Sequence, residues 1–454
     1  MLVVLGVACT GKEPPPSVPD AGLLRDTQAS LDAGDLPSST CGDGVVQPGE
    51  HCDDGNSSEA DDCANDCTPA APFHDFDALI LDLLNTWDVP GATVAVTHDQ
   101  RLVLRRAYGL ADREAQRPMK RTDRMRIASL AKAVTSVAVL RLVEEQRLAL
   151  DDLAFTILGD PDPPAGQTKD PRLASITVAH LLRHEGGWDR DVSGDPMFKS
   201  RIISQALGIP GPATAQDTLS YMLGQPLDFD PGTNYAYSNF GYSVLGRIIE
   251  QVTGQSYEDY VRSDVLAPMG ITRMELGRTK RGDRPDDEVR YHLYEGARDV
   301  VSVFPQDTER VPRPNGGWHQ EAMDAHGGWI ASATDLVRFV TAVDGRSGFA
   351  DLLTPASIVQ MTQRPELSRW RTRSVYYGMG WSVRPTEGDA NWWHMGALPG
   401  TATLFLRSWH GFNWVILTNG RPSDSSGFFS ALDQAMWGAQ QSVTAWPEYD
   451  LFRP

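Results

Sequence analysis

Positive charge is scarce in this chain. Its 454 residues contain 41 Lys and Arg against 60 Asp and Glu, which gives a net charge of −19. The first 75 residues alone hold 14 acidic and 2 basic side chains, so 12 of the 19 excess negative charges lie there. Because nucleic-acid backbones are bound by clustered Lys and Arg, this balance argues against a nucleic-acid partner. Long apolar runs are lacking too, since no stretch approaches the ~20 residues that a membrane-spanning helix requires.

Cysteine is rare outside one short segment. Four of the five cysteines, Cys41, Cys52, Cys63 and Cys67, lie in a stretch rich in Asp and Gly. Residues 41–68 are too few to bury a core, so we expect two disulfides there, with three pairings possible. Zinc is the rival interpretation, because Cys-x3-Cys is tolerable ligand spacing, but the surrounding Asp and Gly favour oxidised cysteines. The segment resembles a short cysteine-rich repeat of exported myxobacterial proteins.

The fifth cysteine, Cys9, ends an apolar run that starts at Met1. The run resembles the end of a bacterial lipoprotein signal, although it is shorter than a usual apolar core and no Lys or Arg precedes it. This resemblance implies a lipid on Cys9 and an extracytoplasmic location, with the protein anchored to a bacterial membrane, the outer membrane in our interpretation, or secreted. The alternative is a frayed N-terminus with a free thiol. We interpret residues 1–9 as a signal remnant and residues 10–40, rich in Pro, Ser, Asp, Ala and Gly, as a disordered linker.

Ser129 and Lys132 are the first pair of residues that indicates chemistry. Residues three apart on a helix lie on one face, so an amine at Lys132 can reach the Ser129 hydroxyl. A serine hydroxyl is a poor nucleophile at neutral pH and needs such a base. Apolar residues recur at helical spacing from Leu130 to Leu148, which places Ser129 near the start of a buried amphipathic helix. A lone Ser-x-x-Lys also occurs by chance and is weak evidence by itself.

A second motif, Tyr237-Ser238-Asn239, follows a turn signal at residues 230–233 and precedes an apolar helix that starts near Tyr242. We therefore expect it on a connecting segment, where functional side chains are common. A phenol at this position could pass a proton between Ser129, Lys132 and a leaving group, if a nearby cation lowers its pKa.

A third motif, His394-Met395-Gly396, lies in an aromatic-rich stretch that predicts a strand, followed by strands over 401–407 and 413–418. We expect an edge strand in which Gly396 lets a substrate approach the backbone closely. The N–H groups of Ala397 and Ser129 would then form an oxyanion hole. The alternative is a glycine-kinked edge strand without this role.

Together the three motifs resemble those of the penicillin-recognising serine hydrolases, in particular the branch of class C β-lactamases, D-alanyl-D-alanine carboxypeptidases and β-lactamase-like esterases. The resemblance covers about residues 75–440 and implies the family's α+β fold, an antiparallel sheet flanked by helices with an inset helical subdomain. Helical patterns near 76–87 and 427–437 and strands at 92–96 and 102–107 fit this layout. We assign residues 73–440 to the hydrolase domain.

The resemblance also implies an acyl-enzyme mechanism that needs no metal or cofactor and acts on a small-molecule or peptide substrate. Ser129 would attack a carbonyl after giving its proton to Lys132 and Tyr237, while Asn239 would orient the substrate and Lys132. His394 would stand where many relatives have lysine, as a cation that is charged only part of the time near neutrality.

Two positions depart from the family pattern. Met395 stands where relatives have Thr or Ser to hold a substrate carboxylate, and a thioether is only a weak acceptor. Residues 185–188 replace Thr-Ser-Gly in a loop near the site, or form only a surface turn. We therefore expect an esterase-like hydrolase that prefers neutral substrates, with a D,D-carboxypeptidase or β-lactamase as the alternative. A non-catalytic ligand-binding or surface-display protein is a further alternative, against which the retained Ser129, Lys132, Tyr237 and Asn239 argue.

Overall fold

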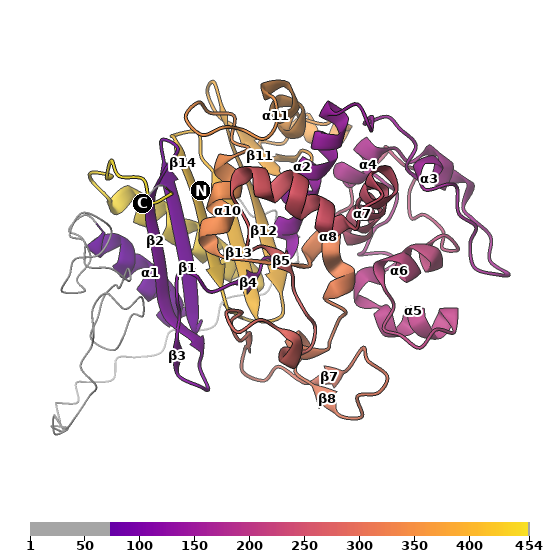
Figure 1. Cartoon of the computed structure of the whole chain (residues 1–454), viewed down its shortest axis with the longest axis horizontal. Helices are drawn as coiled ribbons and strands as arrows, with labels where there is room; N and C mark the ends of the chain where they lie inside the picture. Colours follow the sequence, from indigo (N-terminus) through magenta and orange to yellow (C-terminus); the bar gives the residue numbers. More distant parts are fainter. Residues whose placement is uncertain (1–72, 453–454) are drawn as a thin grey trace, which may run out of the picture.

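The structure, a computed structural model, describes residues 73–452. The predicted signal remnant, linker and cysteine-rich repeat, with Cys9, Cys41, Cys52, Cys63 and Cys67, lie outside the described residues. Within the described part the predicted α+β fold is confirmed, because helices cover both faces of one antiparallel sheet (Figure 1). No helix between residues 73 and 452 combines the length and the apolar character needed to cross a bilayer.

The central sheet has eight strands, and all its neighbouring strands run antiparallel. Its long strands are rich in buried apolar side chains, as expected for a sheet enclosed between two helical layers. The strands predicted at 92–96, 102–107, 401–407 and 413–418 are all present. In spatial order the sheet consists of β10 (Tyr376–Tyr377), β11 (Ser382–Pro385), β12 (Ala390–Leu398), β13 (Thr401–Arg407), β14 (Phe412–Thr418), β1 (Gly91–His98), β2 (Arg101–Asp112) and β3 (Arg117–Pro118).

The terminal helices α1 (His74–Thr86) and α12 (Ser425–Ser442) cover one face of the sheet. In α1 the side chains of Phe76, Ile80 and Leu83 recur at helical spacing and are buried. They share one core with apolar side chains of α12 and of the sheet strands. The helices predicted near 76–87 and 427–437 are therefore present, and together they form a single layer.

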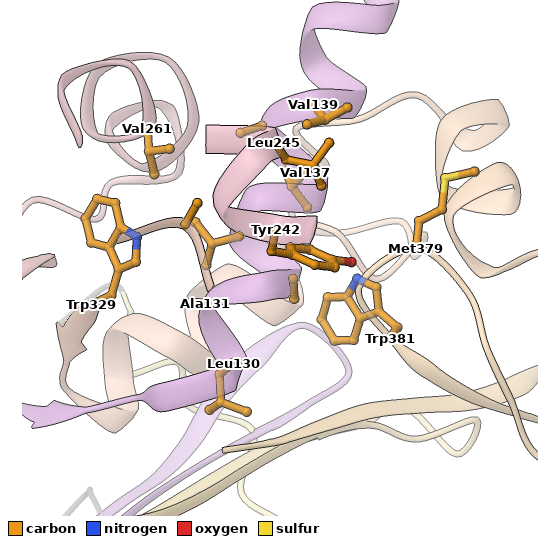
Figure 2. Close-up of a cluster of buried hydrophobic side chains, with 14 of the residues drawn as sticks. Leu130, Ala131, Val137, Val139, Tyr242, Leu245, Val261, Trp329, Met379 and Trp381 are labelled. Atoms are coloured by element: carbon orange, nitrogen blue, oxygen red, sulfur yellow. The ribbon is translucent and has the colours of Figure 1, made fainter. Parts of the chain in front are cut away.

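The opposite face packs against α10 (Ala333–Thr341) and α2 (Ala131–Glu144). Helix α2 is buried on nearly every side from Ala131 to Leu140, so the expected amphipathic character is wrong. Figure 2 shows it enclosed by side chains of other elements, among them Tyr242, Leu245, Trp329 and Trp381. Close packing on all sides holds the helix rigidly, which fixes the residues at its N-terminus.

A helical subdomain is inset between α2 and the later strands, on the right of Figure 1. Its helices are α3 (Ala154–Ile157), α4 (Val178–Leu182), α5 (Ser200–Leu207), α6 (Ala215–Met222), α7 (Asn239–Thr253) and α8 (Tyr257–Tyr260), which continues into the π-helical turn Val261–Leu266. Several short strands form three small sheets. The first consists of β4 (Met125–Arg126), β5 (Glu275–Leu276) and β9 (Trp329–Ala331), the second of β6 (His292–Leu293) and β15 (Gly420–Arg421), and the third of β7 (Val300–Val301) and β8 (Arg310–Val311). Helix α9 (Asp324–Gly327) precedes β9, and α11 (Pro355–Thr362) lies between α10 and β10.

Candidate active site

Ser129 lies in the short 3-10 helix Ala128–Leu130, which leads directly into α2. Ala128 has a φ of 51°, in the left-handed region that residues with a Cβ rarely adopt. The carbonyl of Ile127 accepts a hydrogen bond from Thr403 Oγ1 on β13 at 2.9 Å, which ties this segment to the sheet. Ser129 is thus held, half-buried, at the start of the buried helix, where the sequence places it.

Lys132 is fully buried one turn further on, and its Nζ contacts three oxygen atoms. Nζ lies 3.2 Å from Ser129 Oγ, 2.7 Å from Asn239 Oδ1 and 2.8 Å from the carbonyl oxygen of His326. Burial lowers the pKa of Lys132 well below its usual value, a shift that Asp195 opposes and Arg190 reinforces. The lysine can therefore lose its proton at a much lower pH than an exposed lysine.

A neutral Lys132 matches these three oxygens in only one way. The Asn239 amide oxygen and the His326 carbonyl oxygen can only accept hydrogen bonds, so they take the two N–H groups of a neutral amine. The nitrogen lone pair is then left to accept the hydroxyl proton of Ser129. The arrangement can accordingly serve as a general base beside a serine nucleophile.

Tyr237 lies on the segment that leads into α7, close to both Ser129 and Lys132. Lys132 Nζ lies 4.8 Å from the centroid of its ring, and so does Arg190 Cζ. The expected net lowering of the Tyr237 pKa by a neighbouring cation is not found, because burial raises this pKa by more than the charge of Arg190 and a hydrogen bond with Ser129 lower it. Tyr237 therefore stays a phenol at neutral pH and can donate a proton rather than take one.

The turn at residues 184–188 fixes the segment that contains Tyr237. His184, with a φ of 60°, accepts the Ser238 N–H at its Nδ1 (3.1 Å), and its ring centroid lies 4.3 Å from that of Tyr237. Ser238 Oγ in turn accepts the N–H of Gly241 and caps α7, which puts Asn239 on the first turn of that helix. Glu185 at 6% exposure is buried, so the interpretation of this segment as a surface turn is wrong.

His394 on β12 is neutral, which corrects its prediction as a partly charged cation. Its Nδ1 lies 2.8 Å from the Met395 carbonyl oxygen and must donate to it, so Nε2, 3.0 Å from the Tyr377 hydroxyl, accepts. Burial and the neighbouring Lys132 lower the pKa of His394 to about 3. At neutral pH it therefore supplies no positive charge to Tyr237 or to a substrate.

Strand β12 is paired on both sides, so the prediction of an edge strand is wrong for the strand as a whole. Strand β11 pairs only with residues 390–393, however, and leaves residues 394–398 free on that side. A Cβ at Gly396 would lie 2.3 Å from the Ile127 carbonyl oxygen and 2.2 Å from Thr403 Oγ1. Only glycine therefore lets β12 approach the Ser129 segment this closely.

The N–H of Ala397 faces this free side of β12. A two-residue loop closes the β12–β13 hairpin, so the Leu398–Thr401 pair next to it is hydrogen-bonded and the Ala397–Ala402 pair is not. In agreement, the N–H of Ala402 turns away from β12 and donates to Thr418 Oγ1 at 3.2 Å. The Ala397 N–H is thus free to join that of Ser129 in an oxyanion hole.

A pocket of about 500 Å³ opens above these groups. It is lined by Ser129, Tyr237, Asn239, His394, Met395 and Ala397, with Lys132 buried next to Ser129 and Gly396 packed behind the pocket. The fold thus brings together all the catalytic and substrate-binding residues predicted within residues 73–452. This part of the chain contains no group of three or more His, Cys, Asp or Glu side chains placed to hold a metal ion.

The sequence reasoning missed two arginines in this pocket, Arg190 and Arg421. Neither forms an ion pair with a carboxylate among residues 73–452, which is unusual in a chain with an excess of acidic residues. The Nε of Arg421 is buried without a hydrogen-bond partner in that part of the chain. No local pattern marks them, because Arg190 lies in a loop and Arg421 ends the short strand β15, and only the fold brings the two to the pocket.

The fold and the site together define a class, a serine hydrolase in which a serine at a helix start is paired with a buried lysine. The profile of the Beta-lactamase family matches residues 76–434, and the chain belongs to that family.

Relatives of this chain include named esterases and peptidases. Esterase EstB of Burkholderia gladioli is 29% identical over 358 residues, which cover 75% of this chain and 86% of the esterase. An Escherichia coli (strain K12) protein named "Putative D-alanyl-D-alanine carboxypeptidase" is 27% identical over 316 residues, 65% of this chain and 68% of its own. The D-amino acid amidase from Ochrobactrum anthropi SV3 has the same fold, with a TM-score of 0.62, 22% identity and coverage of 81% and 99% of the two chains.

Proposed function

We propose that this protein is an esterase that acts through an acyl-enzyme formed on Ser129. The observation that supports it best is the position of Lys132 Nζ, 3.2 Å from Ser129 Oγ with its other contacts made to two acceptors. A neutral lysine in this geometry has its lone pair available only to the serine. Metal is unnecessary for the chemistry, because the base and the nucleophile are both side chains of this chain.

In the proposed cycle Ser129 Oγ attacks the ester carbonyl carbon while Lys132 takes the hydroxyl proton. The carbonyl oxygen becomes an oxyanion beside the N–H groups of Ser129 and Ala397, where preorganised donors stabilise the developing charge. Tyr237, protonated at neutral pH, donates its proton to the leaving alcohol and is reprotonated from Lys132. Water then attacks the acyl carbonyl carbon while Tyr237 and Lys132 take its proton. They return a proton to Ser129 Oγ as the acid leaves, which restores the free enzyme. Asn239 holds Lys132 and faces the substrate.

Ester substrates are favoured over carboxylate-bearing peptides by the third motif. Met395 provides no hydroxyl and His394 no charge, so this motif has no group to hold a substrate carboxylate. The similarity to Esterase EstB, which extends over 86% of that protein, supports the same choice.

A second candidate function, hydrolysis of D-alanyl-D-alanine peptides or β-lactams, is favoured by Arg190 and Arg421. Guanidinium groups bind carboxylates well, and these two line the pocket without a carboxylate partner among residues 73–452. They could replace the missing hydroxyl of the third motif.

One experiment separates these functions. Intact mass is measured after exposure to a fluorophosphonate, to a p-nitrophenyl ester and to a penicillin, with Ser129→Ala as the control protein. The proposal predicts a fluorophosphonate adduct on the wild type, none on Ser129→Ala, and faster turnover of the neutral ester than of penicillin. Labelling of Ser129→Ala would refute the nucleophile, and faster penicillin acylation would favour the second candidate.

We also propose that the protein is exported and anchored through a lipid on Cys9, with Cys41, Cys52, Cys63 and Cys67 in disulfides. The support is the apolar run that ends at Cys9 and the density of cysteines in residues 41–68. Mass spectrometry of the native protein tests it. Cys9 found in a disulfide, or four free thiols in the repeat, would contradict it.

A further inference from the structure

Asp195 connects to the proposed base through a chain of hydrogen bonds that the mechanism above does not use. One carboxylate oxygen, Oδ1, accepts the N–H of Met197 at 3.1 Å and caps the short 3-10 helix that follows. The other, Oδ2, accepts from Asn239 Nδ2 at 2.6 Å. The opposite end of the same amide, Oδ1 of Asn239, accepts from Lys132 Nζ at 2.7 Å.

The order of donors and acceptors in this series of hydrogen bonds is fixed. A carboxylate can only accept hydrogen bonds, so it forces the Asn239 amide to point its NH₂ group at Asp195 and its oxygen at Lys132. If the amide flipped, its NH₂ group would face Lys132. A neutral lysine would then accept from Asn239 with its lone pair, and Ser129 would lose its proton acceptor.

We propose that Asp195 is a positioning residue that sets the orientation of Asn239 and, through it, the direction of the Lys132 lone pair. This inference rests on the proposed function, because it assumes that Lys132 is the base for Ser129. Asp195 itself touches neither the serine nor the substrate position, and its role is to keep one rotamer of one amide.

The negative charge of Asp195 also raises the pKa of Lys132. Of the charged side chains around Lys132 in residues 73–452, Asp195 raises its pKa and Arg190 lowers it, while burial dominates. The other titratable groups near Lys132 are uncharged at neutral pH: His184, His326, His394, Tyr237 and Tyr242. Removing the negative charge should therefore lower the pKa of Lys132 further.

The test uses two variants of the full chain and a matched control. In Asp195→Asn a single amide must replace two acceptor oxygens, so Asn239 loses its forced orientation and kcat/KM for a p-nitrophenyl ester should fall by about 10- to 100-fold, the size of a charge-assisted hydrogen bond. The acid limb of the kcat/KM profile, which reports the free enzyme's base, should move to lower pH by roughly half a unit or more. Asp191→Asn removes a charge from an exposed position of the same loop and should change neither.

The exchange variant Asp195→Asn/Asn239→Asp sharpens the test. It restores the order of donors and acceptors, since the amide now at position 195 donates to the carboxylate now at position 239. The negative charge, however, then lies directly against Lys132. Its acid limb should move to higher pH than in the wild type, opposite to the single variant. Melting temperatures identify any loss of fold.

An acid limb that stays in place in Asp195→Asn, or that moves as far in Asp191→Asn, would overturn the role of Asp195. This failure differs from that of the proposed function, in which Ser129→Ala would keep its activity. If the exchange variant does not fold, the single variant and its control still decide the outcome.

Discussion

Replacement of Lys132 by methionine tests the proposed base most directly. Methionine has a similar length and fills the same buried space, but it cannot accept the Ser129 proton. General-base catalysis contributes about 10²- to 10⁴-fold, so the acylation barrier should rise by about 3 to 5 kcal/mol. The expected result is loss of p-nitrophenyl acetate turnover and slow fluorophosphonate labelling, measured as rates of mass gain.

The same replacement has a separate effect on stability. It leaves Asn239 Oδ1 and the His326 carbonyl without the amine that both contact, and each buried unpaired acceptor costs about 1–3 kcal/mol. The loss is partly offset, because a thioether pays less to leave water than an amine. We expect a net destabilisation of about 1–3 kcal/mol in urea unfolding, so rates must be normalised to the folded fraction.

Combination with Tyr237→Phe shows whether the two residues act together. Each single variant should lower the acylation rate by at least ~10²-fold, whereas the double variant should lose far less than the product, because one proton passes through both groups. Multiplicative losses would refute a shared proton path. Retention of full activity in Lys132→Met would refute the base altogether.

The remaining predictions concern the nucleophile, two residues that line the pocket and the glycine behind it. Ser129→Ala should abolish ester hydrolysis with a nearly unchanged melting temperature, and residual turnover beyond contamination would place the nucleophile elsewhere. Because the pKa of His394 is about 3 when folded and about 6.5 when unfolded, the unfolded chain binds the extra proton below pH 6.5. Between pH 7 and pH 5 the unfolding free energy of the wild type should therefore decrease by about 2 kcal/mol more than that of His394→Asn. Equal decreases in the two proteins would contradict a neutral His394. Gly396→Ala should cost about 1–3 kcal/mol and most of the activity, since its Cβ would collide with the Ile127 carbonyl, and a fully active variant would disprove this close approach. Met395→Thr should raise penicillin acylation by about 10-fold with neutral esters little affected, and no change would show that a carboxylate is held elsewhere.

Motif spacing was sufficient to predict much of the site. Ser129 and Lys132 are three residues apart on a helix, and this local geometry is the same whatever surrounds it. The turn signal before Tyr237 and the glycine in the third motif likewise report on the backbone near those residues. The terminal helices and the long strands could be predicted for the same reason, since their apolar periodicity reflects burial on one face or both.

Electrostatic properties of the site depended on the tertiary structure. The pKa values of Tyr237 and His394 are dominated by burial, which no local pattern reports. The pKa of Tyr237 is therefore raised where the sequence predicted a lowered one, and His394 is neutral where the sequence predicted a partial positive charge. The partial edge of β12 also required the fold, because it arises where the short β11 stops pairing.

By itself, the sequence determined the proposed nucleophile and base, because residue types at a short, fixed spacing indicate them. The order of its three motifs along the chain resembles a family whose α+β fold the structure confirms. Only the tertiary structure decided which distant side chains surround them: Asp195 and Arg190 from one loop, Arg421 from the far end of the chain. Their positions depend on contacts between residues that are distant in sequence, such as Asp195 and Asn239, 44 residues apart, and charge and hydrogen-bond polarity act through space rather than along the sequence.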